Sequence, residues 1–310
     1  MKARKKLLLV GIETTIGTPV AIADCVLMTV SELDSAPYEG DRSERQRIKE
    51  QFGADAEVNM APYTTVTTTI PLAGSGTVGT PPNFGVVLRA LGIREMIDTG
   101  VDVRYMPATD DHESLTVYFV EDGQLQCVPG CKGTAEIGFT AKGFPTAQVT
   151  LTGSYQRPIT HTDAVTQTET NHAGEIPVNK QNTSKFDVHG YEGCGQSLSF
   201  SLGNEVVYRN LAGCDGVEIT DRSVSGTVEI EAPDITTKNY FQQMESHQVV
   251  NLDAISFVHG TTPGNIIEFR APKAQLSTIS RADSDGVLHY QLGARFLPNA
   301  GDDEFVLIFK

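Results

Sequence analysis

Stretches in which apolar and polar residues alternate recur along most of the chain, with glycine-containing turns between them. Because the side chains of a strand point alternately to its two faces, this pattern predicts strands with one buried face and one wet face. Together the stretches predict a mainly β protein made of antiparallel strands. The clearest lie at 64–70, 115–120, 146–153, 227–232 and 287–296, and 198–202 with 205–208 is predicted to form a hairpin.

Two segments have helical spacing instead. The first helix is predicted over 84–92, between Pro81, which fits a first turn, and Gly92, which ends it. Its apolar face consists of Phe84, Val87, Leu88 and Leu91. The second helix is predicted over 236–246, with Tyr240, Phe241 and Met244 on one side.

The order of these elements occurs twice. A strand, a short helix and a series of strand pairs end near Pro158, and the same series ends again near Pro298. This predicts two similar antiparallel β-sandwich or β-barrel domains, each with one short helix. We place them at 24–158 and 186–310, joined by a linker over 159–185 that is rich in Thr, Asn, Gln and His.

Two further segments stand outside the repeated pattern. Residues 1–23 are interpreted as an extended N-terminal arm, whose basic residues are Lys2, Arg4, Lys5 and Lys6. The insertion 35–62 is long and polar, and connections of this length inside a compact domain are usually functional or disordered. A capping box at Ser43 and Gln46, with Ile48 and Phe52 four residues apart, predicts a small helix in it. Its positively charged residues are Arg42, Arg45, Arg47 and Lys49.

Composition narrows the classes of function. The 310 residues carry a net charge of −15 and no Trp. Such a surface repels nucleic acid and anionic membranes, which argues against a DNA-binding groove but allows DNA to pass nearby. The apolar run after Lys6 stops at Glu13, which is short for a signal peptide, and no segment reaches transmembrane length. The five cysteines are expected to be reduced thiols.

No pattern of catalytic or metal-binding residues stands out. Cys127 and Cys131 lack two further ligands at metal-site spacing. The sequence 74–79 fits G-x-G-x-x-G, but the strand before it alternates and no βαβ series follows, so we interpret it as a flexible loop. The acidic runs 110–113 and 302–304 are interpreted as solvated turns, and the seven histidines are scattered. We therefore expect no enzyme, no cofactor and no metal.

Several motifs resemble one protein family. The segment 11–19 is similar to the G-x-E-x-x-x-G-T-P opening of the major tail tube proteins of long-tailed, non-contractile bacteriophages. The resemblance continues over residues 7–158, and the second half joins it mainly through the internal repeat. Its other motifs are 72–81, the helix 84–92, 105–107, 113–119, 130–134 and 151–155.

The resemblance implies assembly without chemistry. Members with a duplicated domain are expected to form trimeric, pseudo-hexameric rings that stack into a hollow tube, through which DNA passes into the host. Implied partners are the tape measure protein in the lumen and the tail terminator and distal tail proteins at the ends. Such a protein would be assembled in the bacterial cytoplasm and would reside in the virion tail, with no membrane contact. The alternative, a secreted or surface carbohydrate-binding or adhesin-like protein, is disfavoured by the missing Trp and export signal.

Three hypotheses about residues follow. The strands 64–70 and 227–232 are expected to pair edge to edge between neighbouring domains. The insertion 35–62 is expected to reach the adjacent ring and meet an acidic surface, with Lys2–Lys6 as a second bridge. The polar strand face is expected to line the lumen, although an outer-wall position stays open. Its candidates are Thr67, Thr69, Thr227, Glu229 and Glu231.

Overall fold

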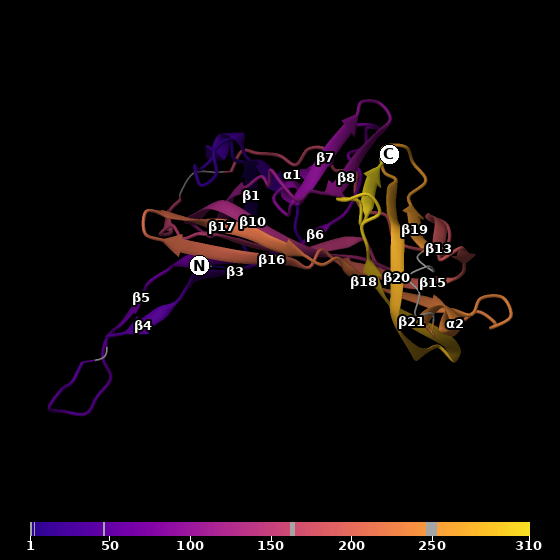
Figure 1. Cartoon of the computed structure of the whole chain (residues 1–310). Coiled ribbons are helices and arrows are strands. Elements are labelled where there is room, and N and C mark those ends of the chain that lie inside the picture. Colours follow the sequence, from indigo (N-terminus) through magenta and orange to yellow (C-terminus); the bar gives the residue numbers. More distant parts are fainter. Residues whose placement is uncertain (1, 3, 46, 162–164, 246–252) are drawn as a thin grey trace.

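The chain forms an arch of antiparallel strands with two short helices (Figure 1). This computed structural model describes residues 2, 4–45, 47–161, 165–245 and 253–310. The mainly β, antiparallel fold and one helix in each half confirm the sequence-based expectation. The helices are shorter than predicted: α1 spans Gly85–Arg89 and α2 spans Tyr240–Glu245. The predicted helix end at Ser246 lies outside the described residues.

One sheet of eight strands runs through both halves. Its first four strands, in spatial order, are β3 (Glu32–Glu39), β6 (Tyr63–Pro71), β11 (Thr146–Ser154) and β10 (Gln124–Thr140). The next four are β15 (Gly195–Ser201), β18 (Ser225–Glu231), β21 (Val287–Phe296) and β20 (Ile267–Ser284).

The two sets of four join where β10 pairs with β15, with Ile137 opposite Phe200. The halves are therefore parts of one continuous sheet, in place of the two separate sheet systems that the sequence predicts.

A second layer covers one face of this sheet in the first half. β1 (Lys6–Ile12) lies between β2 (Val26–Met28) and β9 (Leu115–Glu121), and β9 pairs with the first part of β10. A register shift between Val128 and Cys131 lets β10 bend from this layer into the eight-stranded sheet. The short β12 (Ile159–Thr160) pairs with the start of β10.

The outer strands of the second half connect back to the first half. β19 (Asp253–His259) lies between β13 (Thr183–Val188) and the start of β20, and β13 pairs with β14 (Tyr191–Glu192). β22 (Val306–Phe309) joins β20 to β8 (Asp102–Pro107), which pairs with β7 (Ile93–Asp98). A 3-10 turn, η1 (Ile22–Asp24), precedes β2.

A single large apolar core spans the two halves. Phe200 of β15 stacks on Phe269 at 4.5 Å between ring centroids and touches Phe305 at 5.2 Å. Phe84 beside α1 contacts Phe309 of the last strand at 5.2 Å. These aromatic contacts and the β22–β8 pairing hold the halves together, because their rings are buried and would be exposed on separation.

Two predictions about the first 62 residues are wrong. Residues 6–12 are the buried strand β1, not part of an arm, because Leu8, Leu9 and Val10 pack in the interior. The insertion contains a β-hairpin, β4 (Arg42–Glu44) with β5 (Glu57–Asn59), where a helix was predicted; the capping residue Gln46 lies outside the described residues. With Ile48 and Phe52 fully exposed, no packing supports a helix there.

Two predictions about strand pairing are also wrong. The segment 198–202 does not pair with 205–208: β16 (Asn204–Leu211) pairs with β17 (Cys214–Arg222) to form a separate hairpin. The Thr-rich strand β6 and its counterpart β18 are interior strands, each hydrogen-bonded on both sides, and so they are not free edges.

The glycine loop 74–79 joins the halves and is not a free loop. The Gly74 N–H donates to Asn265 Oδ1 at 2.6 Å, and the Gly76 N–H donates to the Gly264 carbonyl at 3.0 Å. A Cβ at Gly74 would lie 2.0 Å from the Gly264 oxygen, so only glycine permits this close approach.

Candidate assembly surfaces

The eight-stranded sheet has one buried face and one polar face. In β6 the buried residues Val66, Thr68 and Ile70 alternate with partly exposed Thr67 and Thr69. In β18, Val228 and Ile230 are buried, whereas Thr227, Glu229 and Glu231 are exposed or half-buried. The predicted alternation is therefore present, and all five lumen candidates lie on the polar face.

A row of polar side chains crosses all eight strands on this face. Strand pairing places its members opposite one another in sequence, from one edge of the sheet to the other. Sequence reasoning missed Glu32 and Glu136 in this row, although alternation within each strand puts both on the wet face. The row consists of Glu32, Thr69, Gln148, Glu136, Ser201, Ser225, Arg295 and Gln275.

The strands are regularly staggered across the sheet. Glu229 of β18 lies between Ser197 and Gln291 of the two neighbouring strands. Thr69 of β6 lies in the same way between Glu32 and Gln148, so Glu229 and Thr69 occupy corresponding positions in the two halves. The row through Thr69 nevertheless arrives at Ser225, four residues before Glu229. The register thus shifts by about one residue per strand. Eight-stranded barrels with a shear number of 8 have the same shift per strand, and their strands tilt by about 36° to the barrel axis. The sheet has the stagger that closure into a barrel requires.

Two edges of this sheet carry no partner strand among the described residues. β3 pairs only with β6. The second part of β20, residues 275–284, pairs only with β21, whereas its first part is covered by β19 and β22. Unpaired edges expose rows of N–H and C=O groups and are ready-made pairing surfaces. Arg281 and Asp283 are exposed on the β20 edge, the kind of charged guard that keeps an edge from pairing at random.

A hairpin occupies the same connection in each half. β4–β5 lies between β3 and β6, and β16–β17 lies between β15 and β18. The second hairpin folds back over the first half. Glu218 accepts a 2.9 Å hydrogen bond from the ammonium group of buried Lys132, and the rings of Tyr208 and Tyr63 lie 5.5 Å apart between their centroids. The first hairpin instead projects away from the rest of the chain (Figure 1).

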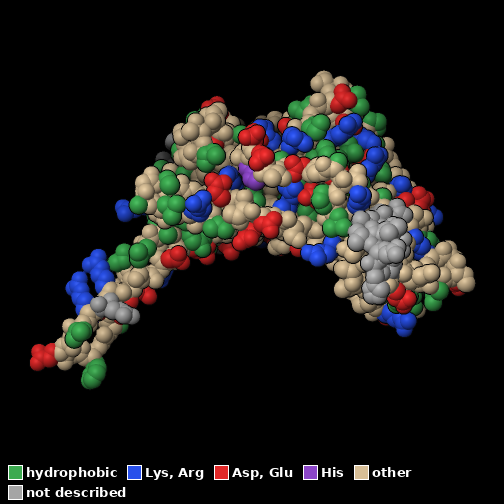
Figure 2. All heavy atoms as spheres, viewed as in Figure 1, with side chains coloured by type: hydrophobic (Ala, Val, Ile, Leu, Met, Phe, Trp, Pro, Cys, Tyr) green, Lys and Arg blue, Asp and Glu red, His purple; other side chains and the backbone are tan. Residues whose placement is uncertain are grey.

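Nearby carboxylates partly neutralise the basic residues of the projecting hairpin. Arg42 lies 3.9 Å from Glu57, and Lys49 pairs with Asp55. Arg45 and Arg47 have no carboxylate partner for their guanidinium groups among the described residues. Figure 2 shows Lys and Arg side chains along the hairpin, hydrophobic ones near its tip, and acidic ones along the concave margin of the arch.

The N-terminal basic residues contact their own chain. The Lys5 ammonium lies 3.2 Å from Asp122, and the Lys2 N–H donates to the same carboxylate at 2.7 Å. These two contacts hold the pKa of Asp122 below its usual range. Lys6 approaches Glu121 at 3.8 Å and the ring of Phe119. Lys2 and Arg4 are both exposed, and the Lys2 contact is made by its backbone, so the side chains of these two residues are the free ones for a bridge to another molecule.

Glu13, the acidic residue of the opening motif, is buried and fully engaged. Its carboxylate accepts hydrogen bonds from the Gly17 and Gly130 N–H groups at 2.7 and 2.8 Å. It also accepts bonds from the hydroxyls of Ser114 and Thr116 at 2.6 and 2.8 Å. The motif therefore fixes the loop after β1 to β9 and to the bend in β10, a structural role.

Arg222, at the end of β17, links the halves near the acidic run 302–304. Its guanidinium donates to the Ala108 carbonyl, to Asp302 and to Glu304, at 2.9, 3.1 and 2.8 Å. Asp302 also accepts a bond from the Thr109 hydroxyl. The Thr109 bond first, and then Arg222, hold the pKa of Asp302 below its usual range. This run is therefore a latch between segments, whereas the sequence predicted a solvated turn.

The described residues contain no group of three or more side chains placed to hold a metal ion. The buried thiols are poor nucleophiles, because burial raises the pKa of Cys25 to about 11 and that of Cys131 well above its usual value. No helix in the described part of the chain has the length and apolarity needed to cross a membrane.

Comparison with known proteins gives the family. A search of curated proteins finds no match. The family model described as phage tail tube protein matches residues 3–292, nearly the whole chain. Members are structural proteins of the virion tail, not enzymes, and they assemble with one another into the tail tube. The chain therefore belongs to the phage tail tube protein family.

Proposed function

We propose that the two halves are duplicated tail-tube domains of a siphovirus-type tail, and that three chains close into a ring by pairing β20 of each with β3 of the next. The common strand order and register of the halves support the duplication. The β10–β15 junction supports the ring, because it already joins the corresponding strands of the two halves within one chain. The ring repeats this junction between chains.

The junction inside the chain predicts the register between chains. Ser280 corresponds to Glu136, since they face Gln291 and Gln148, and Ala36 corresponds to Ser201. Because Glu136 lies opposite Ser201, Ser280 is expected opposite Ala36 of the neighbouring chain. Two residues further along the strands, Ala282 meets Asp34.

Three chains would contribute 24 strands. Strands about 4.8 Å apart, tilted by about 36°, then enclose a barrel of about 45 Å between backbones. That diameter leaves room for side chains on the wall and a DNA duplex inside. Because both halves keep the same one-residue shift per strand, the stagger stays constant around the ring and the barrel closes without strain at any one junction.

The polar face is the lumen wall in this arrangement, because the opposite face is buried against the core. Thr67 and Thr69 then line it in the first half, and Thr227, Glu229 and Glu231 in the second. Carboxylates on a confined wall repel phosphate, so DNA slides without binding. The tape measure protein would occupy this lumen before ejection, and the terminator and distal tail proteins would cap the ends.

Rings stack through the β4–β5 hairpin, whose residues Arg42, Arg45, Arg47 and Lys49 reach the adjacent ring. The basic residues Lys2, Arg4, Lys5 and Lys6 are a second, weaker bridge, since the side chains of Lys5 and Lys6 contact carboxylates or an aromatic ring of their own chain. The observation that carries the whole proposal is the β10–β15 junction beside two unpaired edges.

Paired cysteines test the ring. In a chain with Cys194 and Cys214 replaced by serine, Ala36→Cys and Ser280→Cys are bridged with a short thiol-reactive cross-linker after assembly. We expect covalent species up to three chains and no larger. The matched control, Glu136→Cys with Ser201→Cys, should cross-link inside the chain and keep the mass of a monomer. Assembled tubes of the first variant that yield only monomers, or ladders beyond three chains, would contradict the proposal.

A further inference from the structure

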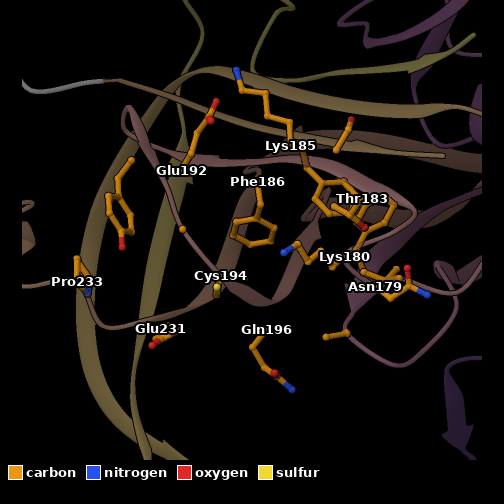
Figure 3. A pocket seen from close by; sticks show the side chains of 18 of the residues that line it. Asn179, Lys180, Thr183, Lys185, Phe186, Glu192, Cys194, Gln196, Glu231 and Pro233 are labelled. Carbon is orange, nitrogen blue, oxygen red and sulfur yellow. The ribbon is translucent and has the colours of Figure 1, made fainter. Parts of the chain in front are cut away.

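A pocket of about 700 Å³ opens at one end of the eight-stranded sheet, beside the junction of the halves (Figure 3). It is lined by the end of β10, the start of β15 and the end of β18. Phe186 projects into its middle, with Cys194 and Gln196 on one side and Lys185 and Glu192 on the other (Figure 3). The rings of Phe139 and Phe257 also line it, 4.6 Å apart between ring centroids.

The hairpin β4–β5 leaves the sheet at the opposite end. β6 begins at Tyr63, next to the hairpin, and runs towards Pro71. In β18 the residue that corresponds to Pro71 is Glu231, since Leu72 and Ala232 donate to the equivalent carbonyls of Pro145 and Leu288. Glu231 lines the pocket. Identical rings that stack head to tail therefore bring the hairpin end of one ring against the pocket end of the next.

The tip of the hairpin carries two apolar side chains that nothing in the chain covers. Ile48 and Phe52 have relative exposures of 107% and 110%, more than any other large apolar side chain of the described residues. Full exposure of a phenylalanine and an isoleucine at the end of a projecting arm marks a contact surface. A phenylalanine ring fits the aromatic lining of the pocket, which offers edge and face contacts.

The charges around the two surfaces are complementary. Arg45 and Arg47 flank the tip without a carboxylate partner for their guanidinium groups in the described part of the chain. The pocket is lined by three carboxylates, those of Glu192, Glu231 and Asp234, and by two lysines, Lys180 and Lys185. Lys185 is paired with Asp187, whereas the Glu192 and Glu231 carboxylates form no ion pair within the described residues. Opposite charges at the rim of an apolar contact favour one orientation of docking and speed the encounter.

We propose that the tip of the β4–β5 hairpin, residues 47–56, docks in this pocket of a chain in the adjacent ring, with Phe52 as the apolar anchor. The inference rests on the proposed stacking of rings and adds the surface that receives the hairpin. Each stacking contact then joins a hairpin of one ring to a pocket of the next. The last ring at one end of the tube has unoccupied pockets, and the last ring at the other end has unbound hairpins. The two ends of the tube differ accordingly.

The native Cys194 tests this docking. In a Cys214→Ser background, Phe52→Cys is assembled into tubes and treated with a mild oxidant. We expect disulfide-linked chains in a ladder that disappears when Cys194 is also replaced by serine. Val58→Cys, nearer the root of the hairpin, is the matched control and should give no ladder that depends on Cys194.

The outcomes separate this inference from the proposed function. Tubes of the Phe52→Cys variant without a Cys194-dependent ladder would overturn the docking and leave the tube itself intact. Absence of rings and tubes from the unmodified chain would instead overturn the proposed function. If the Phe52→Cys substitution prevents stacking, the variants Phe52→Leu and Phe52→Ser test the anchor instead. Tubes from the leucine variant alone would support an apolar anchor at this position, and tubes from both variants would contradict it.

Discussion

Ile137 of β10 lies opposite Phe200 of β15, so the two halves of the chain share one sheet, although 63 residues separate the pair. Both side chains are buried in the common core, and Phe200 contacts three other phenylalanines. The junction is thus an internal copy of the contact that we propose between chains.

Replacing Phe200 by alanine should lower the free energy of unfolding by about 3–5 kcal/mol, because it removes a large buried ring and leaves a cavity. Chemical denaturation measures the change. Phe144→Ala is the control, since Phe144 is 55% exposed and its loss should cost well under about 1 kcal/mol. Equal losses in the two variants would mean that the junction does not hold the halves together.

Glu13→Ala should destabilise the chain by about 3 kcal/mol, because it leaves several buried donors without an acceptor. Glu13→Gln keeps the shape and one acceptor oxygen and should cost less. The same denaturation experiment compares them with Glu57→Ala, which removes only an exposed ion pair. If the Glu13→Ala variant were as stable as the Glu57→Ala variant, the four hydrogen bonds at Glu13 would not contribute measurably to the free energy of unfolding.

How far the sequence predicts this structure depends on the range of each interaction. Alternation placed Thr67 and Glu229 on the correct face, because the orientation of a strand's side chains is a local property. The pairing of Ile137 with Phe200 joins distant segments, and no local pattern encodes it. The spacing of Ile48 and Phe52 suggested a helix, but their apolar faces find no core to pack on. The glycine at 74 was interpreted as flexible, whereas it permits contact with Gly264.

Deleting residues 40–56 should leave folded chains and rings but no tubes, because stacking depends on the hairpin. Native mass spectrometry counts chains in the ring, and negative-stain microscopy detects tubes. Arg4→Ala is the comparison for the N-terminal bridge and should leave tube formation intact. Tubes of normal length from the deletion variant would rule out the hairpin as the stacking element.

The double substitution Glu136→Lys with Glu229→Lys should permit assembly but slow DNA ejection, because it places positive charge on the proposed lumen wall away from the docking pocket. The effect should be greatest at low salt, where screening is weakest. Asp98→Lys with Asp110→Lys, on exposed residues away from the polar face, is the control of equal charge. Ejection rates that do not differ between the two variants at any salt concentration would place Glu136 and Glu229 outside the lumen.

The latch at Asp302 predicts a dependence of stability on pH. Hydrogen bonds from Thr109 and Arg222 lower the pKa of Asp302 in the folded chain. A lowered pKa contributes stability above the unfolded value of about 4, and this contribution disappears as the pH falls through the folded value. Asp302→Asn should therefore lose less stability between pH 7 and pH 3 than the unmodified chain. If thermal unfolding showed the same loss of stability in the Asp302→Asn variant and the unmodified chain, Asp302 would not contribute to the loss of stability in acid.

The most direct test of the account is a cryo-electron microscopy map of assembled tubes at a resolution that separates strands. We predict three chains per ring, one closed barrel of 24 strands from the eight-stranded sheet of each chain, and β20 of each chain hydrogen-bonded to β3 of its neighbour. Ser280 should lie opposite Ala36, with the polar row inside. A tube in which the outer edges of β3 and of residues 275–284 of β20 stay unpaired, or in which the polar face lies outside, would contradict it.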